Sequence, residues 1–329
     1  MTNNQQVVLD PFSTLVGQDQ AIALLKGAIA THRIAPAYLF AGSPGVGRSL
    51  AARAFIELLF CQDIHPDKQL LVQRRLRQGN HPDVLWVEPT YLHNGIRLSA
   101  KEAAEKGLQR KAPPQIRLEQ IREIAQFLSR SVLEASRKVV VLNQAETMAE
   151  AAGNGLLKTL EEPGQGTLIL IAPSTESLLP TLVSRCQRIP FYRLAHSQMQ
   201  EVLRRTGHEA ILDEPSILAI AQGSPGDAIA SFTQLQSIPE QLLQEVTHPP
   251  KSLRHALELA KTIDKSLDTE AQLWLVDYLQ HCYWQYYHQP AIIQVLEQAR
   301  KYLLSYVQPR LVWEVTLLEL NQGKERGNG

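Results

Sequence analysis

The N-terminal part of the chain alternates short, continuous apolar runs with longer amphipathic segments. The apolar runs are rich in β-branched residues, which is typical of buried parallel strands, and they predict strands at residues 37–40, 83–89, 138–142 and 167–172. The amphipathic segments predict helices at residues 18–30, 50–60, 116–131 and 149–161. This alternation indicates a parallel α/β sheet that is covered on both faces. The strands that end at Phe40, Leu142 and Ala172 should finish along one edge, where such sheets bind ligands.

The strand pattern stops near Leu194, and the rest of the sequence has helical periodicity. Short helices are predicted at residues 197–205, 215–222 and 227–235, followed by further helices past Pro249-Pro250. Nine of the twenty aromatic residues lie after position 273. Such a concentration indicates base stacking or, as we favour, a helical core or a subunit interface.

Two polar segments interrupt the α/β pattern. Residues 62–80 include a basic helical piece at residues 73–77, which we interpret as a solvated face, with a DNA-phosphate patch as the alternative. Residues 91–114 contain the pair Asn94-Gly95, a signal for a tight hairpin turn. The sequence assigns no role to this second segment.

A glycine-rich loop joins the first predicted strand to the next helix. It follows the phosphate-loop spacing Gly-x-x-x-x-Gly-Lys-Ser/Thr, except that Arg48 replaces the lysine. Gly42, Gly45 and Gly47 allow backbone N–H groups to face an anion, and the helix N-terminus adds its dipole. Ser49 supplies the hydroxyl that would bind Mg²⁺. A strand–turn–helix corner with incidental glycines is the alternative, which the agreement of strand, spacing and helix disfavours.

ATP hydrolysis at such a loop needs an acidic residue that holds Mg²⁺ and a second carboxylate that orients water. After the predicted strand 138–142, the sequence has Asn143 and Gln144 instead. Their amides bring no negative charge to a metal and cannot act as a base. Glu146 lies two residues further on, on a predicted helix face. The sequence therefore predicts poor hydrolysis if 138–142 is the relevant strand; the other candidate strand ends in a single acid, Glu88.

Composition limits the classes of function. Acidic and basic residues balance at 33 each, so a nucleic-acid contact would need a local basic patch. The three cysteines are far apart in the sequence, which fits a reducing cytoplasm and argues against a disulfide framework or a cysteine metal cluster. Neither a signal peptide nor a membrane-spanning run is apparent. We therefore expect a soluble cytoplasmic protein.

Arg185 lies at the end of a short predicted helix, within the triplet Ser-Arg-Cys at residues 184–186. Taken alone, such a residue is most simply a surface charge. An arginine in this position can also reach a nucleotide bound to a neighbouring subunit. There it stabilises the departing phosphoryl group, an effect worth roughly a thousandfold or more in rate.

Several stretches of the sequence together resemble the bacterial clamp-loader delta-prime subunits of DNA polymerase III, which have an AAA+ fold. The stretches that carry the resemblance are residues 15–18, 42–49, 80–83, 154–163, 184–186 and 223–226. The leucine-rich block that ends in Glu161-Glu162-Pro163 and the Ser-Arg-Cys triplet are the most specific. The resemblance runs over residues 1–237 and continues more weakly to the C-terminus.

The resemblance implies an AAA+ phosphate-loop domain, a small helical lid and an all-helical collar, at residues 1–192, 193–237 and 238–329. It implies that Arg185 is an arginine finger acting in trans, and that Asn143 and Gln144 are a degenerate form of the acidic pair. Gly226 agrees, because ATPase relatives usually carry a sensing arginine there. Many relatives have a four-cysteine zinc site in the segment 62–80. Only Cys61 is present here, so no metal is expected, and polar contacts or packing must hold the segment.

We therefore expect a non-hydrolysing subunit that braces a hetero-pentameric loader with gamma/tau and delta subunits. It would supply Arg185 while a sliding clamp is loaded on primed DNA during replication, without contact to a membrane. DNA polymerase and ATPase activities would belong to partner subunits of the DNA polymerase III holoenzyme. No cofactor is assigned, and ATP or ADP binding stays open because Arg48 keeps a positive charge in the loop. The alternatives are a gamma/tau-like ATPase that uses Arg48 and Glu146, and a nucleotide-binding regulator outside replication.

Overall fold

The computed structural model describes residues 10–62, 64–106, 113–162 and 164–326. The protein divides into two compact units, residues 1–198 and 199–329. The three-domain division, with boundaries after residues 192 and 237, stays a prediction. Among the described residues, none of the helices combines the length and the apolar character that a membrane span requires.

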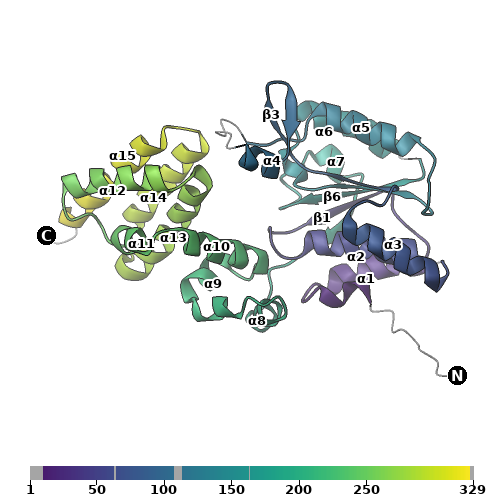
Figure 1. Cartoon of the computed structure of the whole chain (residues 1–329), viewed down its shortest axis with the longest axis horizontal. Helices are drawn as coiled ribbons and strands as arrows, with labels where there is room; N and C mark the ends of the chain where they lie inside the picture. Colours follow the sequence, from purple (N-terminus) through teal and green to yellow (C-terminus); the bar gives the residue numbers. More distant parts are fainter. Residues whose placement is uncertain (1–9, 63, 107–112, 163, 327–329) are drawn as a thin grey trace. The chain divides into compact units, whose positions relative to one another are not determined.

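The first unit is built on a parallel five-stranded sheet with the strand order β2-β5-β6-β1-β7 (Figure 1). The strands are β1 (Ala37–Ala41), β2 (Val84–Val87), β5 (Lys138–Leu142), β6 (Gly166–Ala172) and β7 (Gln187–Pro190). Ala41 pairs with Ala172, and Leu142 pairs with Leu170. The carboxyl ends of β1, β5 and β6 therefore share one edge of the sheet, as the sequence predicts.

Helices cover both faces of this sheet (Figure 1). One core contains Phe40 and is covered by η1 (Pro11–Thr14), α1 (Asp19–Ala30), α2 (Arg48–Cys61) and α3 (Pro66–Gln78). The other contains Leu39 and is covered by α5 (Leu118–Ser129), α6 (Glu150–Glu161) and α7 (Pro180–Val183). Neighbouring residues of β1 thus fill different cores, which explains why the strand is apolar at every position. The predicted α/β class, a parallel sheet with helices on both faces that is followed by helical regions, is confirmed.

Three elements extend the sequence prediction. β7 was not predicted, because its sequence lacks an apolar run. It is an edge strand in which only Ile189 is fully buried. α3 spans the polar segment in which only a short basic piece was expected to be helical. Residues 91–98 form an antiparallel hairpin of β3 (Tyr91–His93) and β4 (Ile96–Leu98), which α4 (Ala100–Glu105) follows. Asn94 and Gly95 both have positive φ, 49° and 79°, so the predicted hairpin turn is confirmed.

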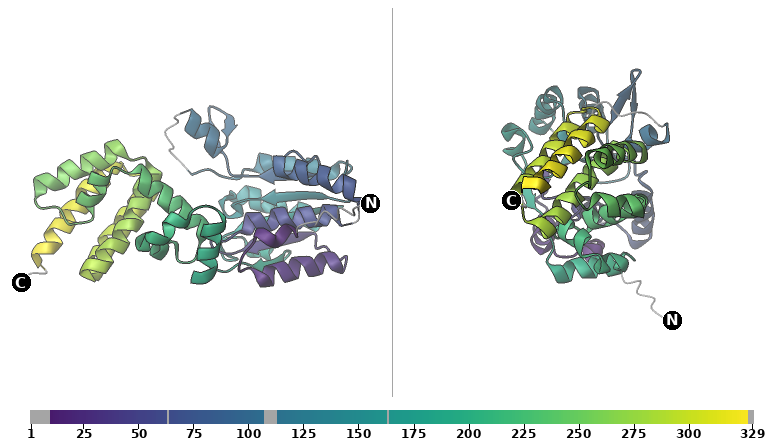
Figure 2. Two further views of the ribbon diagram at one scale, coloured as in Figure 1. Left: turned by 60° about the horizontal axis from the view of Figure 1, so that its bottom comes forward. Right: turned by 90° about the vertical axis from the view of Figure 1, so that its left-hand side faces the viewer.

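The second unit is helical throughout, and its green-to-yellow helices form a bundle after residue 240 (Figure 2). From residue 196 the helices are α8 (His196–Arg205), η3 (Glu209–Asp213), α9 (Pro215–Ala221), α10 (Pro225–Ser237), α11 (Glu240–Val246), α12 (Leu253–Ser266), α13 (Thr269–Tyr287), α14 (Pro290–Leu304) and α15 (Pro309–Arg326). Tyr283 and Trp313 are fully buried in the bundle, and Trp313 Nε1 donates a hydrogen bond to Gln272 Oε1 at 2.8 Å. These two aromatics confirm the helical-core interpretation, whereas Trp284 and Tyr286 are exposed.

Candidate functional site

The glycine-rich loop connects buried β1 to the N-terminus of α2, which has 14 residues. Gly45 and Gly47 adopt positive φ of 70° and 101°, and Gly47 is the N-cap of α2. Side chains rarely tolerate this backbone region, so the turn requires glycine at both positions. Gly42 is needed for a different reason, since a Cβ atom there would lie 2.4 Å from the carbonyl oxygen of Phe191. The result is a tight loop at a helix N-terminus, a geometry that suits an anion.

Gln18 ties this loop to the end of β7. The residue is only 2% exposed, and its Nε2 donates to the carbonyl oxygens of Val46 at 3.3 Å and Tyr192 at 2.7 Å. Its Oε1 accepts a hydrogen bond from the backbone N–H of Tyr192 at 3.1 Å. One buried amide thereby joins the loop to a residue that lies 174 positions away in the sequence. The sequence indicates Gln18 only as part of a motif. The hydrogen bonds by which Gln18 joins the loop to Tyr192, which we call the clasp, are seen only in the structure.

The end of β5 lies at the same sheet edge as the loop. Asn143 follows the strand directly, and its backbone N–H donates to the carbonyl oxygen of Val87 at 2.9 Å. Gln144 adopts the left-handed conformation, with φ of 53°, and is exposed. The two positions that would carry the acidic pair thus hold two amides, neither of which supplies charge to a metal.

Glu146 comes next, on the short helix η2 (Ala145–Thr147). Although the residue keeps part of its surface exposed, protein atoms around its carboxyl raise the pKa of Glu146. Its own backbone N–H and the guanidinium of Arg48 offset this rise only in part. The charge of Arg48 therefore acts on the carboxyl group of Glu146. A carboxylate with a raised pKa is the kind of group that can act as a base.

Arg185 lies two residues after the end of α7, and its side chain is 40% exposed. Its Nη1 donates to the carbonyl oxygen of Thr181 at 3.1 Å, and its Nη2 donates to Glu161 Oε1 at 2.9 Å. Both partners belong to the same polypeptide, at the C-terminus of α6 and on α7. The guanidinium is therefore held at the surface rather than packed into the core. Glu161 had no predicted role of its own, and its only signal was its place in the leucine-rich block.

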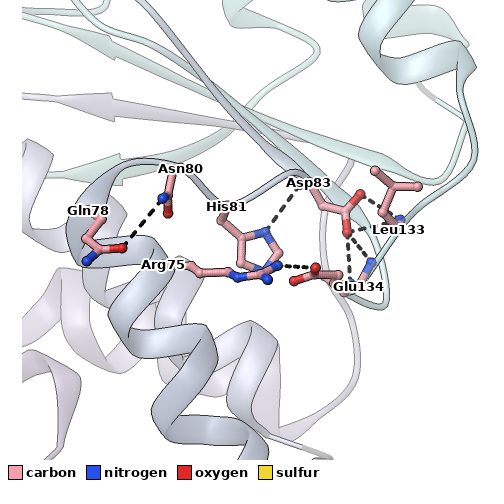
Figure 3. A network of polar contacts seen from close by, with 8 residues as sticks. Arg75, Gln78, Asn80, His81, Asp83, Leu133 and Glu134 are labelled. Carbon is pink, nitrogen blue, oxygen red and sulfur yellow. Dashed lines mark hydrogen bonds and ion pairs between the residues drawn. The ribbon is translucent and has the colours of Figure 1, made fainter.

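The segment that lacks the zinc cysteines is held by a polar network (Figure 3). Arg75 on α3 forms an ion pair with Glu134, and Asp83 accepts hydrogen bonds from the backbone N–H groups of Leu133, Glu134 and Ala135. Burial by itself would raise the pKa of Asp83, but these three donors outweigh it and the pKa is lowered. The expectation was that polar contacts or packing hold this segment, and both occur, since Arg75 pairs with Glu134 while Val72 and Leu76 pack against the core. No group of three or more metal-ligating side chains occurs within the described ranges.

His81 completes this network beneath α3. The ring is 4% exposed, and its Nδ1 accepts a hydrogen bond from the backbone N–H of Asp83 at 3.2 Å. Since Nδ1 is an acceptor, the ring is neutral and carries its proton on Nε2. Burial lowers the pKa of His81, which is consistent with a neutral imidazole.

Family models match both parts of the protein. The model described as DNA polymerase III, delta subunit, matches residues 17–195. A second model, described as cyanobacterial DNA polymerase III delta prime, C-terminal domain, matches residues 197–320. Together they cover most of both compact units.

Individual relatives agree with these models. The chain is 32% identical to DNA polymerase III subunit delta' of Bacillus subtilis over 56% of its own length and 51% of the relative's. It is 34% identical to the subunit of the same name from Pseudomonas aeruginosa, over 72% of its length and 67% of the relative's. The chain thus spans about half to two thirds of these relatives. A solved gamma subunit-related protein from Thermotoga maritima aligns over 92% of this chain and 99% of its own, with a TM-score of 0.48 and 17% identity.

Proposed function

The chain belongs to the DNA polymerase III delta-prime family, and from this membership we propose that it is a non-hydrolysing AAA+ subunit of a clamp loader. In this role it braces a hetero-pentamer with gamma/tau and delta subunits while a sliding clamp is placed on primed DNA. Its helical C-terminal region is proposed to join the collar. The exposed aromatic side chains of that region, such as Trp284 and Tyr286, support this because subunit interfaces are enriched in aromatics.

The observation that carries the proposal is the pairing of an anion-binding loop with two amides at the end of β5. The loop has the glycine conformations and the helix N-terminus that suit a phosphate. Asn143 and Gln144 occupy the positions from which carboxylates would hold Mg²⁺ and orient water. Nucleotide binding, if it occurs, would therefore be followed by little or no hydrolysis in this subunit. The loop would serve as a structural element of the subunit.

Arg185 is proposed to act on a neighbour's nucleotide. Three observations support this role. The guanidinium is exposed, and two of its N–H groups are held by hydrogen bonds within its own subunit. The acceptors of these hydrogen bonds, Thr181 and Glu161, lie outside the phosphate loop. An arginine has five N–H donors, so a guanidinium held by Thr181 and Glu161 keeps donors for a phosphate. Fixing the side chain in advance also reduces the entropy lost when the phosphate is bound.

The test is a loader reconstituted with the full-length subunit that carries Arg185→Ala. DNA-stimulated ATP hydrolysis and clamp loading are expected to fall, because a trans arginine contributes roughly a thousandfold or more at the site that it serves. Unchanged hydrolysis with unchanged clamp loading would remove the finger role. Failure of the protein to co-purify with the other loader subunits would instead remove the assignment to a loader.

A second candidate function is ATP hydrolysis by this subunit itself, and the electrostatic attraction between Arg48 and Glu146 favours it. Glu146 would serve as the base and Arg48 as the cation at the phosphates. The purified protein assayed alone with Mg²⁺ and ATP separates the two proposals. Steady turnover that is lost in Glu146→Ala would support the ATPase, whereas absence of turnover supports the non-hydrolysing subunit.

A further inference from the structure

A pocket opens at the sheet edge opposite the phosphate loop. It has a volume of about 430 Å³ and lies where β1, β5 and β6 begin. Its walls are formed by Ile34, Pro36, Ser136, Arg137, Gly164, Gln165 and Gly166. The pocket is therefore mixed in character, with apolar side chains, a hydroxyl and a glycine-containing turn around one cation. Neither the phosphate loop nor Arg185 takes part in it.

Arg137 is held in this pocket by a hydrogen bond to β6. Its Nη1 donates to Thr167 Oγ1 at 3.0 Å, and the Thr167 hydroxyl, which is fully buried, in turn donates to the carbonyl oxygen of Ala35 at 3.5 Å. This series of hydrogen bonds fixes the guanidinium against the start of β6. A guanidinium has five N–H donors, and within the described ranges one of them has a protein acceptor, which leaves donors for solvent or a ligand.

A carboxylate partner for Arg137 does not occur in the described parts of the protein. Burial lowers the pKa of Arg137, and the group that opposes this effect is the phenol of Tyr38 rather than an acid. Arg75 and Arg300, which are also partly buried, do have acidic partners, in the pairs Arg75–Glu134 and Arg300–Asp277. Arg137 thus carries the cost of a half-buried charge without the ion pair that usually compensates for it.

We propose that this pocket receives a carboxylate presented by a protein partner, either an acidic side chain or the terminal carboxylate of a polypeptide. A guanidinium binds a carboxylate through two parallel hydrogen bonds, and the Ser136 hydroxyl and the turn at residues 164–166 offer further polar contacts. The apolar walls, Ile34 and Pro36, suit the methylene groups of an acidic residue. A nucleic acid is disfavoured, because its binding depends on several cations along a phosphate backbone and this pocket is lined by one.

The proposal is tested with the full-length protein and a fluorescent hexaglutamate peptide at low ionic strength, followed by anisotropy. Arg137→Gln is expected to weaken binding about tenfold or more, as loss of one bidentate charged pair implies. Arg33→Gln is the matched control, because it removes an exposed charge close to Ile34 in the sequence and should leave binding unchanged. Equal binding by the parent and Arg137→Gln would overturn the proposal. So would Arg137-dependent binding of a single-stranded oligonucleotide without binding of the peptide.

A second measurement avoids dependence on one variant. Arg137→Lys keeps a positive charge but lacks the planar guanidinium group. The Nε–H resonance of Arg137 is therefore the one that is present in the nuclear magnetic resonance spectrum of the parent and missing from that of Arg137→Lys. Titration of the unmodified protein with the peptide should shift this resonance in a saturable manner. Titration with inorganic phosphate should shift it only weakly. No peptide-induced shift, or a stronger shift with phosphate, would contradict a carboxylate site.

Discussion

Replacement of Asp83 by alanine is expected to loosen the polar network that holds the loop before β5. Asp83 is fully buried, and its carboxylate accepts hydrogen bonds from Leu133 at 2.9 Å, Glu134 at 2.7 Å and Ala135 at 2.9 Å. Alanine leaves all three backbone N–H groups without this acceptor. Each buried donor left without a partner costs about 1–3 kcal/mol, and water can reach part of this exposed loop. We therefore take the lower end for each donor, which gives a loss of about 3 kcal/mol.

Two assays measure this loss. Urea unfolding followed by Trp86, the only tryptophan of the first unit, should show a lower midpoint for Asp83→Ala. Hydrogen exchange of the amides at residues 133–135 should speed up by roughly a hundredfold, the equivalent of about 3 kcal/mol. Glu162→Ala is the control, because it removes an exposed acid from the same unit and should change stability by less than about 0.5 kcal/mol. Unchanged amide protection in Asp83→Ala would refute the assignment of these hydrogen bonds.

Three further predictions concern the glycine loop, the ion pair of Arg185 and the buried His81. Gly42→Ala should lower the free energy of unfolding in urea by about 1–3 kcal/mol, because the new Cβ atom would clash with the Phe191 carbonyl oxygen. The control is Gly27→Ala on helix α1, which should be neutral or stabilising because nothing lies within 4 Å of its Cβ position. Glu161→Gln should slow ATP hydrolysis in a reconstituted loader by at most about fivefold, because its ion pair with Arg185 is exposed. The control Glu162→Gln should hydrolyse ATP at the parental rate. If Glu161→Gln also keeps the parental rate, Glu161 does not position Arg185. His81 has a folded-state pKa below its ordinary value of 6.5, so the unfolded protein binds more protons just below that value, and stability should fall as the pH drops from about 6.5. His81→Asn keeps an acceptor near the Asp83 N–H and should flatten this part of the pH profile in thermal melts; a slope equal to the parent's would contradict it.

The parts of the fold that follow from local sequence were predictable. β1, β5 and β6 are apolar at nearly every position because both faces are covered, and this pattern is visible without a structure. β7 was not predictable in this way, because an edge strand needs only one buried side chain among four residues. The extent of α3 was also hidden, since its few apolar residues lie in a strongly polar segment.

The residues of the candidate site show the same division. The loop glycines and the amides after β5 were identified from spacing, because each lies within a few residues of a strand end. The clasp formed by Gln18 and Tyr192 joins residues 174 positions apart, and the pair Glu161–Arg185 joins residues 24 apart. Contacts of this range depend on how α6, α7 and β7 pack, which no local pattern encodes. The carboxylate pocket at Arg137 is assembled from the starts of three strands for the same reason.

The central claim is that this subunit supplies a cation to a partner's nucleotide without hydrolysing its own. The most direct measurement is single-turnover hydrolysis of ATP already bound to a reconstituted loader that carries Arg185→Ala. Arg188→Ala serves as the control, since Arg188 is an exposed arginine on neighbouring β7. We predict that one bound ATP per complex is hydrolysed roughly a thousandfold more slowly with Arg185→Ala, and that Arg188→Ala behaves like the parent. Hydrolysis of every bound ATP at the parental rate would contradict the claim.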